Sequence, residues 1–140
     1  MLFKEEKRDL FTVDDKYYLC HCISDDFALG AGIAVQFEKR YKLKRELFRL
    51  YPEGLGSVGC VLVGKVFNLV TKEKYYHKPT LITLQQSLIQ MKELAIQNNI
   101  KYIAMPRIGC GLDGLEWNDV RNIICAVFQD TDVKILVCYV

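Results

Sequence analysis

The stretch Pro106-Arg107-Ile108-Gly109-Cys110-Gly111-Leu112-Asp113 decides how this chain folds, together with an earlier one, Leu29-Gly30-Ala31-Gly32-Ile33-Ala34. Each stretch lies between an apolar run typical of a strand and an amphipathic run typical of a helix. At such a junction the backbone N–H groups at the positive end of the helix are exposed, and glycines let an anion approach closely. Two such loops in one small chain predict a ligand with two adjacent phosphates, bound from both sides.

The elements around these loops alternate between strands and helices. Residues 58–63 and 65–71 are expected to turn tightly at Gly64 as an antiparallel pair, so the predicted sheet is mixed. The fold class is therefore α/β: a three-layer α/β/α sandwich around a central mixed sheet. We expect strands at 2–7, 16–23, 58–63, 65–71, 102–105 and 133–140, and helices at 32–41, 45–50, from Thr80 to Asn98, and from Trp117 to Val127.

Length and charge narrow the class of protein. The 140 residues are expected to form one domain, 1–140, and the net charge of +2 is too small to argue for nucleic acid. We find neither a signal peptide nor an apolar run of about 20 residues, so we expect no membrane contact. The predicted location is cytoplasmic, or nuclear in a eukaryote, and the chain is expected to be a monomer.

The six cysteines do not form a disulfide or metal pattern. Most lie inside apolar runs, where a free cysteine behaves as a small hydrophobic residue. No Cys-x-x-Cys pair occurs, and in Cys20-His21-Cys22 a strand places the two sulfurs on one face and the imidazole on the other. We therefore expect free thiols and no metal site.

Two familiar glycine motifs can be weighed against the second loop. Gly109 to Gly114 matches Gly-x-Gly-x-x-Gly, but only one helix and one strand follow, so a dinucleotide-binding fold is excluded by chain position. Neither loop ends in the Gly-Lys-Ser/Thr of a P-loop. Each loop alone could be a simple glycine-bearing connector. Because loops at the carboxyl ends of parallel strands converge, we expect both loops to border one crevice.

Two ionisable residues are expected at the same crevice. Lys72 ends a predicted strand and Asp113 ends the second loop. The simplest interpretation makes Lys72 a solvated strand-end lysine and Asp113 a helix cap. The alternative is an amine and a carboxylate that act together on the bound ligand.

At this point several strings together resemble a known family. They are His21–Ser24, Gly30–Val35, Thr71-Lys72, His77–Thr80 and Met105–Asp113, and their order and content are similar to a macrodomain of the terminal ADP-ribose protein glycohydrolase subclass. The resemblance runs from about Asp9 to the C-terminus. Two departures are Arg8, where the family usually has glycine, and the segment 42–56, which we expect to lie at the surface and to shape substrate choice.

The resemblance implies that the ligand is ADP-ribose and that no cofactor is needed. Asp9 would accept from the adenine amine with Leu10 beside it, the two loops would bind the diphosphate, and Ser24 would lie near the distal ribose. The implied binding residues are Asp9, Leu10, Ser24, Gly30, Ala31, Gly32, Ile33, Thr71, Pro106, Arg107, Ile108, Gly109, Cys110, Gly111 and Leu112.

The resemblance also implies an activity, the hydrolysis of mono-ADP-ribosylated glutamate or aspartate on proteins, with O-acetyl-ADP-ribose as a further substrate. Lys72 would be the nucleophile and Asp113 the acid and base. Two alternatives remain open. The chain could be a non-catalytic ADP-ribose reader, or it could remove ADP-ribose from DNA, as an antitoxin-type branch does. The lysines and arginines from Lys39 to Arg49 leave the DNA alternative open, although such a run is usually a solvated helix face.

Overall fold

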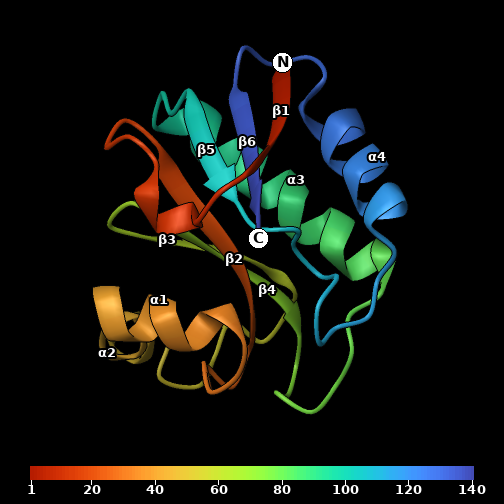
Figure 1. The fold of residues 1–140 in the computed structure, drawn as a ribbon. Coiled ribbons are helices and arrows are strands. Elements are labelled where there is room, and N and C mark those ends of the chain that lie inside the picture. Colours follow the sequence, from red (N-terminus) through yellow and green to blue (C-terminus); the bar gives the residue numbers. More distant parts are fainter.

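The computed structural model describes all 140 residues and contains one six-stranded sheet in the order β1-β6-β5-β2-β4-β3 (Figure 1). All neighbouring strands are parallel except β3 and β4, which form a hairpin at Gly64, where φ is 56°. The predicted mixed sheet is confirmed. The strands are β1 (Leu2–Lys7), β2 (Tyr18–Ser24), β3 (Gly59–Val63), β4 (Val66–Lys72), β5 (Tyr102–Met105) and β6 (Lys134–Tyr139).

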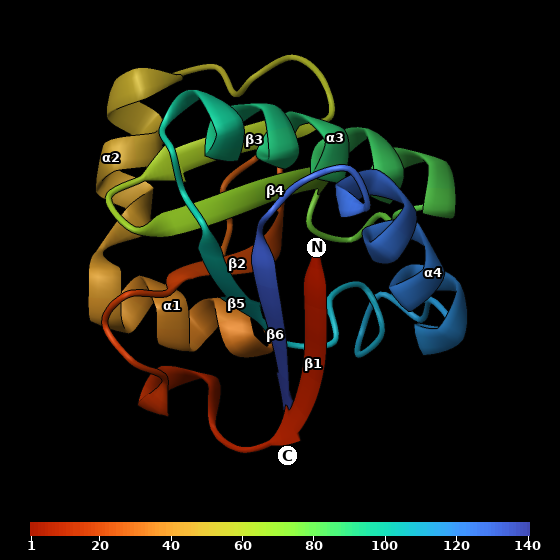
Figure 2. The ribbon, with the colours of Figure 1, turned by 90° about the horizontal axis from the view of Figure 1, so that it is seen from above.

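Helices cover both faces of the sheet, as the three-layer prediction requires. Figures 1 and 2 show α1 and α2 on one face and α3 and α4 on the other. Each face has its own buried apolar cluster, one including Phe37 and Leu47, the other including Leu84 and Ile124. The helices are α1 (Ile33–Tyr41), α2 (Leu43–Leu50), α3 (Leu81–Gln97) and α4 (Trp117–Phe128), with a short 3-10 helix at Leu10–Thr12.

The longest helix, α3, shows why its boundaries could be predicted. Thr80 and Thr83 form a reciprocal capping box, in which Thr83 N donates to Thr80 Oγ1 at 3.1 Å and Thr80 N donates to Thr83 Oγ1 at 3.0 Å. The helix ends before Asn98, and Asn99 takes a left-handed conformation with φ 54°. No helix is long and apolar enough to cross a bilayer.

The separation of α1 from α2 lies earlier than expected. The second helix was expected to begin at Arg45, but Lys42 alone separates the two helices, by adopting φ 53°. Its N–H still bonds Glu38 O at 2.9 Å, and the Glu38 carboxylate accepts from Lys44 N at 2.8 Å. These bonds satisfy backbone groups at the junction, so α2 starts directly at Leu43.

Candidate active site

Three adjacent parallel strands end at the candidate site. In the order β5-β2-β4, the second glycine loop follows β5, the first follows β2, and Lys72 is the last residue of β4. A shift of register between Ile23 and Ser24 pairs Ser24 with Lys72 at this edge. The topology therefore brings together three segments that are far apart in the sequence.

Lys72 and Asp113 form an ion pair at this edge, with 2.7 Å between Nζ and Oδ1. Their side chains are only 14% and 16% exposed, so Lys72 is not a solvated strand-end lysine. The interpretation of Asp113 as a helix cap is wrong as well, because α4 begins at Trp117 and its N-cap is Glu116. Gly114, at φ 78°, turns the chain between Asp113 and the helix.

The two glycine loops border one crevice, as predicted. A cavity of about 500 Å³ is lined by Cys22, Lys72, Tyr75 and Lys78 and by residues of both loops, Ala31–Ala34 and Pro106–Asp113. A neighbouring cavity of about 350 Å³ shares several of these residues and adds Ser24 and Gly30. Lys72 lines both, so the ion pair lies where the two hollows meet.

The backbone of the loops suits an anionic ligand. Gly32 is the N-cap of α1 at φ 59°, and no side chain caps the helix there. Val35 N donates to Gly32 O at 3.3 Å, whereas the N–H groups of Ile33 and Ala34 form no hydrogen bond within the chain and are free for a ligand. Gly109 has φ 72°, and a Cβ at this position would lie 3.0 Å from Leu115 Cδ1. Both glycines are therefore required by conformation.

Asp26 holds the first loop against the segment that follows Lys72. Its carboxylate accepts from Ser24 Oγ at 2.5 Å, from Ala28 N at 3.2 Å and from Tyr75 N at 2.9 Å. Burial opposes ionisation, but these hydrogen bonds and the charge of Lys74 outweigh it, so the pKa of Asp26 is lowered. Sequence analysis missed this residue, although its place in the polar run after a buried strand was a usable signal.

Cysteine is not a candidate nucleophile here. Cys22 lines both cavities, and burial, followed by the charge of Asp113, raises the pKa of its thiol far above the ordinary value. Burial also raises the pKa of Cys110. All six cysteines are free, and no group of three or more His, Cys, Asp or Glu side chains could hold a metal ion.

Three of the predicted binding residues do not line either cavity. Asp9 caps the 3-10 helix, its Oδ1 accepting from Phe11 N at 2.9 Å, and Leu10 is buried in the core. Thr71 is buried, with no hydrogen-bond partner for Oγ1. Their assignment to the ligand therefore stays a prediction.

Tyr139, at the end of β6, connects the segment of Asp9 with the second loop. Arg8 N donates to Tyr139 O at 2.9 Å, and the Arg107 guanidinium lies 4.3 Å from the centre of the Tyr139 ring. The sequence drew no attention to this tyrosine, because its place beside Arg107 arises only when β6 pairs with β1 and β5.

The fold is an α/β/α sandwich with two glycine loops and an amine–carboxylate pair at one sheet edge, an arrangement that suits a phosphate-bearing ligand. Residues 21–124 match the Macro domain family, and the chain belongs to that family. The family and the fold expected from the sequence are both confirmed.

Two curated relatives and one solved structure illustrate the similarity. Human "ADP-ribose glycohydrolase OARD1" is 43% identical over 136 residues, which cover 94% of this chain and 87% of that protein. "DNA ADP-ribosyl glycohydrolase" of Mycobacterium tuberculosis H37Rv is 30% identical over 115 residues, covering 72% of this chain and 32% of that protein. The structure of the macrodomain of Mycobacterium tuberculosis DarG has a TM-score of 0.83 at 25% identity, covering 99% of this chain and 98% of that one.

Proposed function

We propose that this chain is an ADP-ribose glycohydrolase that releases ADP-ribose from glutamate and aspartate esters on mono-ADP-ribosylated proteins. The 43% identity to a human protein of that activity, over nearly the whole of both chains, supports the general activity. O-acetyl-ADP-ribose, an ester of the same ribose, is a further substrate for this chemistry when its acetyl group is on the anomeric hydroxyl.

The two loops account for the ligand half of the proposal. Gly30–Ile33 bind one side of the diphosphate and Ile108–Gly111 the other, each with backbone N–H groups at a loop or helix start. The distal ribose then lies toward Ser24 and Lys72, and the adenine extends toward Asp9. Pro106, Arg107 and Leu112 belong to the second loop and line the crevice, and Thr71 is buried next to Lys72 at the strand end.

The Lys72–Asp113 contact of 2.7 Å is the observation that carries the catalytic half. Asp113 takes a proton from the Lys72 ammonium. The free amine then forms a bond to the anomeric carbon of the distal ribose, while the bond from that carbon to the acceptor carboxylate breaks. The carboxylate leaves with the bonding electrons, and the restored acceptor side chain is the first product.

Water completes the reaction. The secondary ammonium formed by the attack loses one proton to solvent, and its lone pair then expels the ring oxygen, which takes the proton held by Asp113. This step opens the ribose and leaves a protonated Schiff base between Lys72 and the sugar. The Asp113 carboxylate then takes a proton from the water that adds to the C=N bond. Collapse of this adduct frees Lys72 and the sugar aldehyde, which closes again as ADP-ribose. One water is consumed, and one proton is released to solvent.

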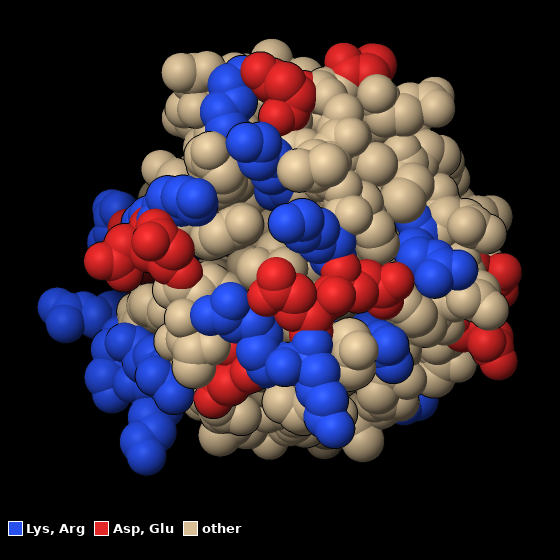
Figure 3. All heavy atoms as spheres, turned by 45° about the horizontal axis from the view of Figure 1, so that its top comes forward, with Lys and Arg blue, Asp and Glu red and all other residues tan.

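A second candidate function is the removal of ADP-ribose from DNA. The 30% identity to the mycobacterial DNA ADP-ribosyl glycohydrolase supports it. Figure 3 shows lysine and arginine gathered on the side of the molecule where α1 and α2 lie. The basic residues of these helices and of the junction between them are Lys39, Arg40, Lys42, Lys44, Arg45 and Arg49. None of them lines the crevice, and Arg49 already pairs with Glu46.

The test is release of ADP-ribose from a protein that has been auto-ADP-ribosylated on glutamate. We expect Lys72→Ala and Asp113→Asn each to lower the rate by about 10²- to 10⁴-fold while ADP-ribose still binds. Lys101→Ala is the matched control, because Lys101 forms a similar pair with Asp132, at 2.8 Å, far from the crevice. Wild-type binding without turnover would instead identify a reader, and unchanged release by Lys72→Ala would exclude the lysine mechanism.

A further inference from the structure

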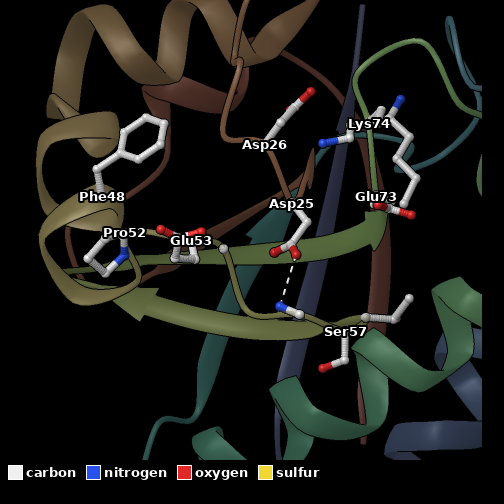
Figure 4. A pocket seen from close by; sticks show the side chains of 12 residues that line it. Asp25, Asp26, Phe48, Pro52, Glu53, Ser57, Glu73 and Lys74 are labelled. Carbon is white, nitrogen blue, oxygen red and sulfur yellow. Dashed lines mark hydrogen bonds between the residues drawn. The ribbon is translucent and has the colours of Figure 1, made fainter.

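A third cavity, of about 600 Å³, lies on the other side of Lys72. Its walls come from three segments: the residues after β2, the connection between α2 and β3, and the residues after β4. Figure 4 shows Asp25 between Pro52 and Glu53 on one side and Glu73 and Lys74 on the other. Lys72 also lines both cavities beside the glycine loops, so this residue is common to all three.

Hydrogen bonds hold this cavity open as a built feature of the fold. Asp25 Oδ1 accepts from Leu55 N at 2.7 Å, and its Oδ2 accepts from Gly56 N at 3.0 Å (Figure 4). Gly54 has φ 79°, and a Cβ there would lie 2.8 Å from Asp25. The connection between α2 and β3 is therefore fixed against the end of β2 without any ligand.

Four carboxylates and two lysines line the cavity. Lys72 is neutralised by its ion pair with Asp113, so the carboxylates outnumber the one remaining cation, the exposed Lys74. Asp25 and Asp26 use their carboxylates within the chain. Glu53 and Glu73 are exposed and form neither a hydrogen bond nor an ion pair with another residue. Phe48 lies at the rim and packs edge-on against the buried Phe27 at 5.2 Å between ring centres.

We propose that this cavity binds the acceptor half of the substrate: a peptide whose modified carboxyl group is flanked by lysine or arginine. The inference rests on the proposed function, because ADP-ribose between the glycine loops leaves the acceptor only the far side of Lys72. Glu53 and Glu73 attract cationic neighbours of the modified residue, and Phe48 accommodates their aliphatic stems. The same carboxylates repel the phosphates of a nucleic acid.

The test compares two synthetic peptides, each carrying one ADP-ribosylated glutamate, flanked by lysines in one and by glutamates in the other. We expect wild type to prefer the lysine peptide by about five- to tenfold in kcat/KM at low salt, and by less at high salt. Charge reversal in Glu53→Lys with Glu73→Lys is expected to remove or invert that preference. Glu93→Lys, an exposed change on α3 that lies outside all three cavities, is expected to keep it.

O-acetyl-ADP-ribose tests the glycohydrolase activity separately from the acceptor site, because its acetyl group is too small to reach the carboxylates of Glu53 and Glu73. Suppose that wild type cleaves O-acetyl-ADP-ribose, and that it cleaves the two peptides with the same kcat/KM, which the double variant Glu53→Lys with Glu73→Lys does not change. The acceptor site is then refuted, and the proposed function stands. If wild type releases ADP-ribose from none of the three, the proposed function itself fails. An ADP-ribosylated DNA oligonucleotide cleaved faster than the lysine peptide would also overturn the assignment.

Discussion

Acid should destabilise this protein through one buried residue, His21. The ring is fully buried and stacks on Phe37, with 4.0 Å between ring centres. Asn68 Nδ2 donates to the carbonyl oxygens of Val61 and Val66, so its Oδ1 is left to accept from His21 Nε2 at 2.7 Å. His21 Nδ1 has no partner. Burial lowers the pKa of His21 from 6.5 to about 4, although the hydrogen bond to Asn68 opposes this shift.

The lowered pKa sets the sign and the size of the effect. Between pH 6.5 and pH 4 the unfolded chain takes up a proton at His21 that the folded chain does not, so the free energy of unfolding falls as the pH falls. Because the pKa falls from 6.5 to about 4, the free energy of unfolding decreases by about 3 kcal/mol across this pH range. Below pH 4 the folded state is protonated as well, and the loss from this residue stops.

Urea unfolding of wild type and His21→Phe, at a series of pH values from 7 to 3.5, measures this loss. Phenylalanine keeps the stacking on Phe37 and removes the titration, so the difference between the two curves should change by about 3 kcal/mol from pH 6.5 to pH 4. His77→Phe is the matched control, because His77 is exposed and should keep the wild-type slope. Parallel curves for wild type and His21→Phe would show that protonation of His21 is not what destabilises the fold in acid.

Three further predictions concern single side chains. Gly54→Ala should lower the free energy of unfolding in urea by about 2 kcal/mol, because it strains a positive φ and collides with Asp25. Asp26→Ala should remove the acceptor for Tyr75 N, lowering the free energy of unfolding by about 2 kcal/mol and raising the KM for ADP-ribosyl esters. An unchanged KM would show that Asp26 does not hold the first loop in place for the substrate. Thr71→Val should raise the free energy of unfolding in urea by about 1 kcal/mol, because the buried hydroxyl has no partner.

Much of the fold could be predicted because local patterns and packing agree. The alternation in Cys20-His21-Cys22 predicted two faces, and the structure packs the two sulfurs toward α3 and α4 and stacks His21 on Phe37 across the sheet. The α3 boundaries followed from Thr80 and Asn98. The junction at Lys42 was misplaced, because a lysine in a left-handed conformation carries no sequence signal of its own.

The sequence predicts which residues of the site lie at the ends of strands, but not which of them are in contact. Parallel strands predicted that Lys72 and Asp113 share a crevice, but their contact depends on the turn at Gly114, which separates Asp113 from α4. The cap interpretation of Asp113 failed for the same reason. Asp26 and the wall at Gly54 depend on hydrogen bonds between segments about 30 or more residues apart, and no local pattern reports these.

Trapping the bond between Lys72 and the sugar would establish directly whether Lys72 is the nucleophile. Wild type turning over an ADP-ribosylated glutamyl peptide is treated with sodium borohydride, which reduces a Schiff base to a stable amine, and the modified residue is located by peptide mass mapping. We expect one ADP-ribose-derived adduct, on Lys72, that is absent from Lys72→Ala. Rapid turnover with no adduct on Lys72, or with an adduct on another lysine, would contradict the lysine mechanism.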